Sequence, residues 1–204
     1  MFLINILLVD DHALFSKSLE IALSDHPEIK KFKSINDISI LDEYIEVNRP
    51  DIILMDINLK NIASEDGLAL AKQILCRYPD QRIVILSGYD LPVYRSEAKK
   101  IGAKCFINKN TEPEKLISLL SQILQGAIIF NTKIPYFEEL TDSEKQILKL
   151  IAGGMKRKDI ANTLYISERT LSNHLQHIFE KLGVTSSIEA VTKAIQMGYI
   201  PPVC

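Results

Sequence analysis

Polar side chains of the types used in phosphoryl transfer follow four short apolar runs of this chain. Each run has the length and apolar character of a buried β-strand. Because ligands of an open parallel α/β sheet bind outside the carboxyl ends of its strands, we expect these side chains to converge on one site. The runs and the residues after them are Ile4–Val9 with Asp10 and Asp11, Ile52–Met55 with Asp56, Ile83–Leu86 with Ser87, and Cys105–Asn108 with Lys109.

The expected site combines three carboxylates, which repel one another unless a cation joins them. Oxygen ligands of this kind suit a hard divalent ion such as Mg²⁺. Ser87 and Lys109 would then hold the oxygens of a phosphoryl group placed on Asp56, because this chemistry depends on positioning and charge stabilisation. The residues therefore predict a phosphorylation switch.

The elements that must position this site alternate between short apolar runs and longer amphipathic ones, from residue 1 to about 125. That alternation is typical of repeated βα units, and five strands predict a doubly wound parallel sheet with helices on both faces. The second strand, Lys31–Ile35, is expected mainly because the alternation requires one. The expected helices are Ala13–Ser24, Ile38–Val47, Gly67–Tyr78, Val93–Ile101 and Glu112–Leu124.

A different organisation begins after a linker at residues 126–138, which contains Pro135. Residues 139–204 show no strand pattern and predict a small all-α domain of four helices. Thr141 and Glu144 have the spacing of a capping box that starts the first helix. The next two helices, expected at Lys156–Leu164 and from Ser167 to Leu182, are joined by a tight turn, which predicts a helix-turn-helix.

The composition of the 204 residues is that of an ordinary soluble globular protein, with a formal net charge of −2. Residues 1–125 hold 15 Lys and Arg against 18 Asp and Glu, and residues 126–204 hold 9 against 8. This weak asymmetry alone does not indicate nucleic acid binding. Three cysteines far apart in the sequence, and an apolar N-terminus without a basic region, favour reduced thiols and a cytoplasmic location.

Both halves resemble the NarL/FixJ-type response regulators of bacterial two-component signalling, over nearly the whole chain. Ordered sets of short motifs, rather than any single one, carry the resemblance. In the first half they are Val9-Asp10-Asp11-His12, Met55-Asp56-Ile57-Asn58, Ser87-Gly88 and Phe106-Ile107-Asn108-Lys109. In the second half, which resembles a LuxR-type helix-turn-helix, they include Lys158-Asp159-Ile160-Ala161, Ile166-Ser167-Glu168-Arg169-Thr170-Leu171 and Lys181-Leu182-Gly183-Val184.

The resemblance implies roles for individual residues of the first half, a receiver domain at residues 1–125. Asp56 would accept the phosphoryl group from a histidine kinase, and Ser87 and Lys109 would bind its oxygens. Ser87 and Phe106 would form the switch, with Phe106 changing rotamer on activation. Asn58 and Tyr89 would tune the lifetime of the aspartyl phosphate. The Mg²⁺ ligands would be Asp10, Asp11, Asp56 and the backbone carbonyl of Asn58.

For the second half the resemblance implies binding to double-stranded DNA as a homodimer formed on activation. The protein would regulate transcription and would not be classed as an enzyme. Base edges would face Ser172, Asn173 and Gln176 of the recognition helix, with Thr170 also at the DNA. Phosphates would contact Lys156, Arg157, Lys158 and Lys181.

The sequence departs from the family pattern in three ways. The loop after Asp56 reaches a glycine only at Gly67 and is about three residues longer than usual. Ser172 stands where Lys is common and Ser187 where Arg is common, which removes contacts to DNA. No Pro follows Lys109.

Other interpretations remain open from the residues alone. Asp11 could simply cap the first helix, Phe106 could be core packing, and Val191 and Ile195 could be core or dimer contacts. A phosphatase that forms an aspartyl phosphate would want a second Asp where Asn58 stands, which argues against that class of enzyme. A receiver that acts through protein contacts, without DNA binding, is a second alternative.

Overall fold

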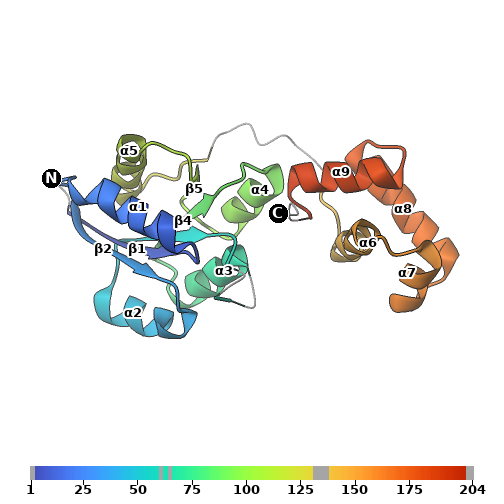
Figure 1. Cartoon of the computed structure of the whole chain (residues 1–204), viewed down its shortest axis with the longest axis horizontal. Coiled ribbons are helices and arrows are strands. Elements are labelled where there is room, and N and C mark those ends of the chain that lie inside the picture. The colour runs from blue at the N-terminus through green and yellow to red at the C-terminus, as the bar shows by residue number, and fades with distance from the viewer. Residues whose placement is uncertain (1–2, 60–61, 64–65, 131–137, 201–204) are drawn as a thin grey trace. The chain divides into compact units, whose positions relative to one another are not determined.

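The computed structural model of the protein describes residues 3–59, 62–63, 66–130 and 138–200. The chain divides at about residue 132 into two compact units. The first unit is an α/β unit and the second is helical, as the sequence predicts (Figure 1).

The first unit is built on a sheet of five parallel strands in the order β2-β1-β3-β4-β5. Because all the strands are parallel, their carboxyl ends lie along one edge of the sheet. The central strands are buried on both faces, which explains their continuous apolar sequences. The strands are β1 (Ile4–Val9), β2 (Ile29–Ile35), β3 (Ile52–Asp56), β4 (Arg82–Ser87) and β5 (Cys105–Asn108).

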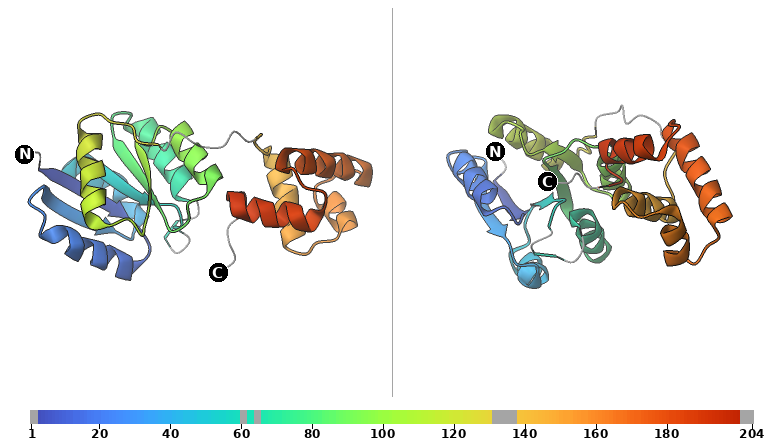
Figure 2. Two further views of the ribbon diagram at one scale, coloured as in Figure 1. Left: turned by 90° about the horizontal axis from the view of Figure 1, so that it is seen from above. Right: turned by 45° about the vertical axis from the view of Figure 1, so that its right-hand side comes forward.

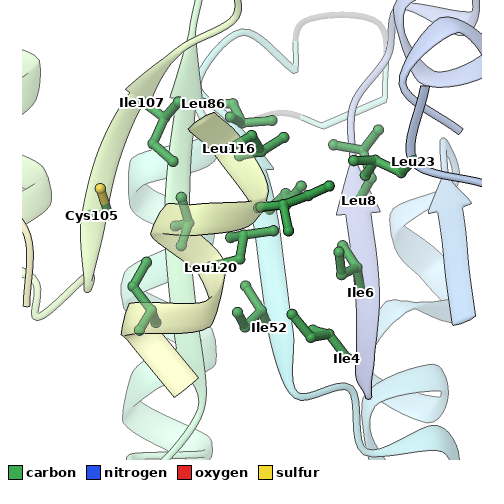
Figure 3. Close-up of a cluster of buried hydrophobic side chains, with 14 of the residues drawn as sticks. Ile4, Ile6, Leu8, Leu23, Ile52, Leu86, Cys105, Ile107, Leu116 and Leu120 are labelled. Atoms are coloured by element: carbon green, nitrogen blue, oxygen red, sulfur yellow. The ribbon is translucent and has the colours of Figure 1, made fainter. Parts of the chain in front are cut away.

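Five α-helices connect and cover the strands. Helices α1 and α5 lie on one face of the sheet, and α2 and α3 lie on the other (Figure 1). Leu116 and Leu120 of α5 pack with Ile4, Ile6 and Leu8 of β1 in the main apolar core (Figure 3). The helices are α1 (Ala13–Ser24), α2 (Leu41–Asn48), α3 (Gly67–Arg77), α4 (Pro92–Lys100) and α5 (Pro113–Leu124).

The region predicted as one helix over Ile38–Val47 is instead a short 3₁₀ turn, η1 (Ile38–Ile40), followed by α2. Asp37 starts the turn by accepting hydrogen bonds from the backbone N–H and the hydroxyl of Ser39. Helix α2 ends at Asn48, and its C-cap residue Arg49 has the left-handed conformation. Pro50 follows, and a proline disfavours right-handed helical geometry in the residue before it, so the helix cannot readily continue. The linker prediction lies partly outside the described residues, at 131–137.

The second unit contains four helices in its described residues, and α7, the turn and α8 form the helix-turn-helix (Figure 2). The capping box at Thr141 and Glu144 is confirmed, with both reciprocal hydrogen bonds present. Val191 and Ile195 pack against the apolar core of the unit. The helices are α6 (Asp142–Ala152), α7 (Arg157–Thr163), α8 (Glu168–Leu182) and α9 (Ser187–Met197).

A buried ion pair links two of these helices. The carboxylate of Glu144 on α6, a residue that is 3 % exposed, lies 2.9 Å from Nζ of Lys181 on α8. Burial alone would raise the pKa of Glu144, but the hydrogen bonds from Lys181 and Thr141 outweigh it and lower that pKa. The ionised pair therefore belongs to the framework of the unit.

Gly67 fixes the loop after β3 against the strand that carries Asp56. Its N–H donates to the carbonyl of Ile57 at 2.8 Å. A Cβ atom at position 67 would lie 1.7 Å from the carbonyl oxygen of Asp56, far inside van der Waals contact. The longer loop thus returns to a close backbone contact that only glycine permits.

We expect Gly67→Ala to destabilise the first unit by at least about 2 kcal/mol, because the backbone at Asp56 must shift to admit the methyl group. Urea unfolding followed by circular dichroism measures the change. Gly88→Ala is the control, since a Cβ there meets nothing within 4 Å. Equal stabilities of the two variants would contradict the inferred close packing.

Glu144→Gln should lower the stability of the helical unit near neutral pH, on the order of 1–2 kcal/mol, because the partly buried Lys181 ammonium loses its ionic partner. The folded-state pKa of Glu144 is depressed, so this stabilisation is present above the unfolded pKa of about 4.3. It disappears as the pH falls through the folded pKa.

The stability difference between wild type and Glu144→Gln should therefore shrink below about pH 4. Chemical denaturation at a series of pH values measures this difference. Glu180→Gln, at an exposed position of the same helix as Lys181, is the matched control. A difference that stays constant down to acid pH would show that the ion pair contributes nothing.

Candidate functional site

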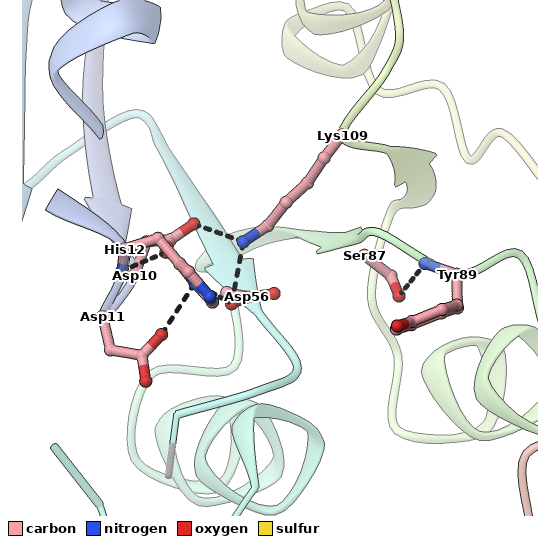
Figure 4. A network of polar contacts seen from close by, with 7 residues as sticks. All are labelled: Asp10, Asp11, His12, Asp56, Ser87, Tyr89 and Lys109. Carbon is pink, nitrogen blue, oxygen red and sulfur yellow. Dashed lines mark hydrogen bonds and ion pairs between the residues drawn. The ribbon is translucent and has the colours of Figure 1, made fainter. Parts of the chain in front are cut away.

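Three aspartates meet at the carboxyl edge of the sheet, where adjacent strands β1 and β3 end. Asp10 and Asp11 follow β1, and Asp56 is the last residue of β3; the preceding residues Val9 and Met55 are register partners. Asp10 is 1 % exposed and Asp56 is 2 % exposed. We call Asp10, Asp11 and Asp56 the acidic cluster (Figure 4).

Lys109 reaches the acidic cluster from the end of β5. Its Nζ lies 2.7 Å from Oδ2 of Asp10 and 2.9 Å from Oδ2 of Asp56. Both oxygens are buried, and although the ammonium lies at ion-pair distance, neither oxygen has a hydrogen-bond partner of acceptable geometry. The Lys109 ammonium also lies 4.6 Å from the centre of the Phe15 ring, which limits its freedom.

The charge of Asp56 is held in a low-polarity environment. Burial raises the pKa of this carboxyl group, the positive charge of Lys109 opposes that rise, and the charge of Asp10 adds to it. A backbone N–H from Asn58 also favours the ionised form. The cluster is therefore short of positive charge, and a cation would stabilise it.

The residues present fit a divalent metal ion. The donor atoms of the three aspartates and of His12 all lie within 4.8 Å of one another. Three ionised carboxylates and one ammonium leave two negative charges, which is the charge that a divalent cation balances. Buried carboxylate oxygens of Asp10 and Asp56 that lack hydrogen bonds are the ligands a hard ion prefers.

Ser87, the last residue of β4, and Tyr89 lie to one side of the cluster (Figure 4). Ser87 is buried, and its Oγ accepts a hydrogen bond from the backbone N–H of Tyr89 at 3.0 Å. The Tyr89 side chain is about half exposed, at 47 %. The hydroxyl is thus oriented by a local turn rather than by the acidic cluster.

Phe106 is buried in β5, beneath the guanidinium of Arg95 from α4. The centre of the guanidinium lies 5.2 Å from the centre of the ring, and Arg95 is also ion-paired with Asp90. Such a cation–π contact favours the inward rotamer of the ring. This position is consistent with core packing and with a switch in its inward state.

Most of the predicted DNA contacts lie on the exposed surface of the helix-turn-helix, namely Lys156, Arg157, Lys158, Thr170, Ser172, Asn173 and Gln176. Three of them have local partners. The Thr170 hydroxyl shares a hydrogen bond with the Ser167 hydroxyl, the Ser172 hydroxyl donates to the carbonyl of Glu168, and the Gln176 amide donates to Glu180. Lys181 is different, because its ammonium is held by Glu144 and by the carbonyl of Glu139. Its ammonium already has partners within the fold, and its contact with a DNA phosphate stays a prediction.

Two residues at the site were not assigned a role from the sequence. His12 stands directly after Asp11, and that adjacency was the only signal available for it. Arg95 gave no signal, because its contact with Phe106 arises from the packing of α4 on β5.

No helix among the described residues has the length and apolar character needed to cross a bilayer.

Known proteins match both units. The family model described as "Response regulator receiver domain" matches residues 6–121, and the model "Bacterial regulatory proteins, luxR family" matches residues 138–194. "Transcriptional regulatory protein YdfI" of Bacillus subtilis is 31% identical, with 96% of this chain and 97% of that protein covered. The "Nitrate/nitrite response regulator protein homolog" of Haemophilus influenzae is also 31% identical, over 92% of this chain and 94% of that protein.

Solved structures show the same fold. The "Structure of the two-component response regulator RcsB-DNA complex" has a TM-score of 0.69 at 20% identity and covers 95% of this chain and 98% of that chain. The receiver model alone spans more than half of the 204 residues. The chain therefore belongs to the two-component response regulators that join a receiver domain to a LuxR-type helix-turn-helix, a family of DNA-binding transcription regulators.

Proposed function

We propose that this protein is a phosphorylation-controlled transcription regulator in which a histidine kinase transfers a phosphoryl group to Asp56. The observation that carries the proposal is the position of Asp56 within the acidic cluster, with the Lys109 ammonium 2.9 Å from its carboxylate. An oxygen of Asp56 attacks phosphorus, and the bond to the donor's imidazole nitrogen breaks. The other ring nitrogen of the donor carries a proton during the transfer, so the donor leaves as neutral histidine.

Each residue of the site has a part in this transfer. When bound, Mg²⁺ would neutralise phosphoryl oxygens, and Asp10, Asp11, Asp56 and the carbonyl of Asn58 would hold it. Lys109 holds a phosphoryl oxygen in place of the Asp10 carboxylate that it contacts now. Asn58 and Tyr89 stand at exposed positions near the acceptor, where they control the approach of water.

Phosphorylation changes the face of the receiver formed by α4 and β5. The phosphoryl group carries a charge of about −2 and three acceptor oxygens, and the Ser87 hydroxyl turns toward it. Ser87 then gives up its contact with Tyr89, and Phe106 moves within β5. This movement shifts an equilibrium between monomer and homodimer.

The helical domain reads DNA in the dimer. Helix α8 enters the major groove, where Ser172, Asn173 and Gln176 face base edges and Thr170 lies at its start. The cluster Lys156, Arg157 and Lys158 contacts phosphates around the start of α7. We assign residues 1–125 to the receiver domain, 126–138 to the linker and 139–204 to the DNA-binding domain, and we propose that the protein acts in the cytoplasm.

Incubation with a small phosphoryl donor and Mg²⁺ should give a single phosphoryl adduct in the intact mass of the wild type. Asp56→Asn should give none and should still melt cooperatively, because the amide removes a charge that burial disfavours. Asp80→Asn, at an exposed aspartate, is the control that keeps the adduct. An adduct that persists in Asp56→Asn would place the acceptor elsewhere.

DNA binding and domain stability should respond to different lysines. Lys158→Ala should weaken binding to all sequences and reduce the slope of log K against log salt by about 1, with an unchanged melt. Lys181→Ala should instead destabilise the helical domain on the order of 2 kcal/mol, because Glu144 loses its buried partner. Fluorescence anisotropy over a salt series and thermal melts measure the two effects.

Asn173→Ala should reduce the ratio of specific to non-specific affinity, because base-edge contacts determine sequence preference. If neither the phosphorylated nor the unphosphorylated wild type binds any DNA in a salt-dependent manner, a regulator that acts by protein contact replaces this proposal.

A further inference from the structure

We propose that His12 is an additional protein ligand of the divalent cation at the acidic cluster. Its imidazole nitrogen would make the site favour ions that accept nitrogen ligands, such as Ni²⁺, more than the carboxylates alone would. The inference rests on the cation site of the proposed function. It goes beyond that function because it concerns which metal ion the site selects.

The geometry of His12 relative to the carboxylates carries the inference. Nδ1 of His12 lies 2.9 Å from Oδ1 of Asp11, 3.2 Å from Oδ1 of Asp10 and 3.7 Å from Oδ2 of Asp56. Neighbouring ligands of an octahedral ion with bonds of about 2.1 Å lie roughly 3 Å apart. The distances from this nitrogen to the three carboxylate oxygens are therefore those found between ligands of one metal ion (Figure 4).

The backbone holds His12 in this place. It is the N-cap residue of α1 in an extended conformation, and its N–H donates to Oδ1 of Asp10 at 2.8 Å. Its side chain makes no capping hydrogen bond and is about half exposed, at 52 %. Nδ1 is directed at the carboxylates, at hydrogen-bond distance from Oδ1 of Asp10. The ring can therefore serve as a metal ligand without giving up a capping role, and its removal does not uncap the helix.

A second observation points to a cation independently of His12. The Oδ2 atoms of Asp10 and Asp56 are buried and lack well-formed hydrogen bonds, although Lys109 lies at ion-pair distance from both. Oxygens in this state gain from a metal ion. Carboxylates suit Mg²⁺, whereas imidazole suits Ni²⁺, Zn²⁺ and related ions, so a mixed set shifts the preference of the site toward the second group.

The test compares Ni²⁺ and Mg²⁺ binding to the full chain by calorimetric titration at one fixed pH. The variants are His12→Ala and, as a matched control for nickel bound to surface histidines, His177→Ala on the exposed side of α8. We expect His12→Ala to weaken Ni²⁺ binding at the cluster about tenfold or more, and Mg²⁺ binding less than about threefold. His177→Ala should leave both affinities unchanged.

A spectroscopic measurement identifies the ligand directly. With Mn²⁺ as a paramagnetic probe, electron spin echo modulation should show a coordinated nitrogen in the wild type and in His177→Ala. The signal should be absent in His12→Ala. Its persistence there would assign the nitrogen to another residue and overturn the inference.

The remaining outcomes are also decisive. Equal losses of Ni²⁺ and Mg²⁺ affinity in His12→Ala would mean that His12 acts on the cluster without bonding to the ion. Unchanged Ni²⁺ binding in His12→Ala would mean that His12 is not part of the metal site. If the protein forms the Asp56 adduct with Mg²⁺ and shows either of these results, the proposed function stands and only the inference about His12 is overturned. If the protein binds neither ion, the cation site itself is overturned.

Discussion

The mutual repulsion of three carboxylates at the end of β1 and β3 is the constraint on which the receiver depends. Parallel pairing of these strands forces Asp10 and Asp56 together, and burial prevents water from screening them. The single ammonium of Lys109 offsets only part of the charge. The site is therefore built to gain from added positive charge and from ligands that bring it, and much of the fold around it serves to keep the aspartates in place.

The helical domain treats its buried charge in the opposite way. Glu144 has one cation, Lys181, and hydrogen bonds from the capping box, so the group is satisfied within the domain. The Glu144–Lys181 pair, whose charges are balanced, makes the helical domain rigid and does not respond to a ligand. The acidic cluster, whose negative charge is only partly balanced, can respond to a bound cation. The receiver therefore contains the reactive site, whereas the helical domain is a fixed framework that presents α8.

Sequence patterns revealed the parts of this structure that local chemistry determines. Strand ends, the capping box at Thr141 and the end of α8 at Leu182 follow from neighbouring residues, and they were predicted within one or two positions. Contacts between distant elements were not visible: the cation–π contact of Arg95 with Phe106 and the capture of Lys181 by Glu144 depend on packing. An exposed lysine and a buried one look alike in a sequence.

The contacts that hold Phe106 inward are weak enough for one phosphoryl group to overcome. A cation–π contact contributes about 0.5–2 kcal/mol, and the partly exposed pair of Arg95 with Asp90 adds at most about 1 kcal/mol. New charge-assisted hydrogen bonds from Ser87 and Lys109 to a phosphoryl group contribute about 1.5–3 kcal/mol each. Converting a 1:99 equilibrium into a 99:1 equilibrium takes roughly 5.5 kcal/mol. Two such bonds supply most of that difference, so under the proposed function Arg95 would set the resting position of Phe106 without locking it.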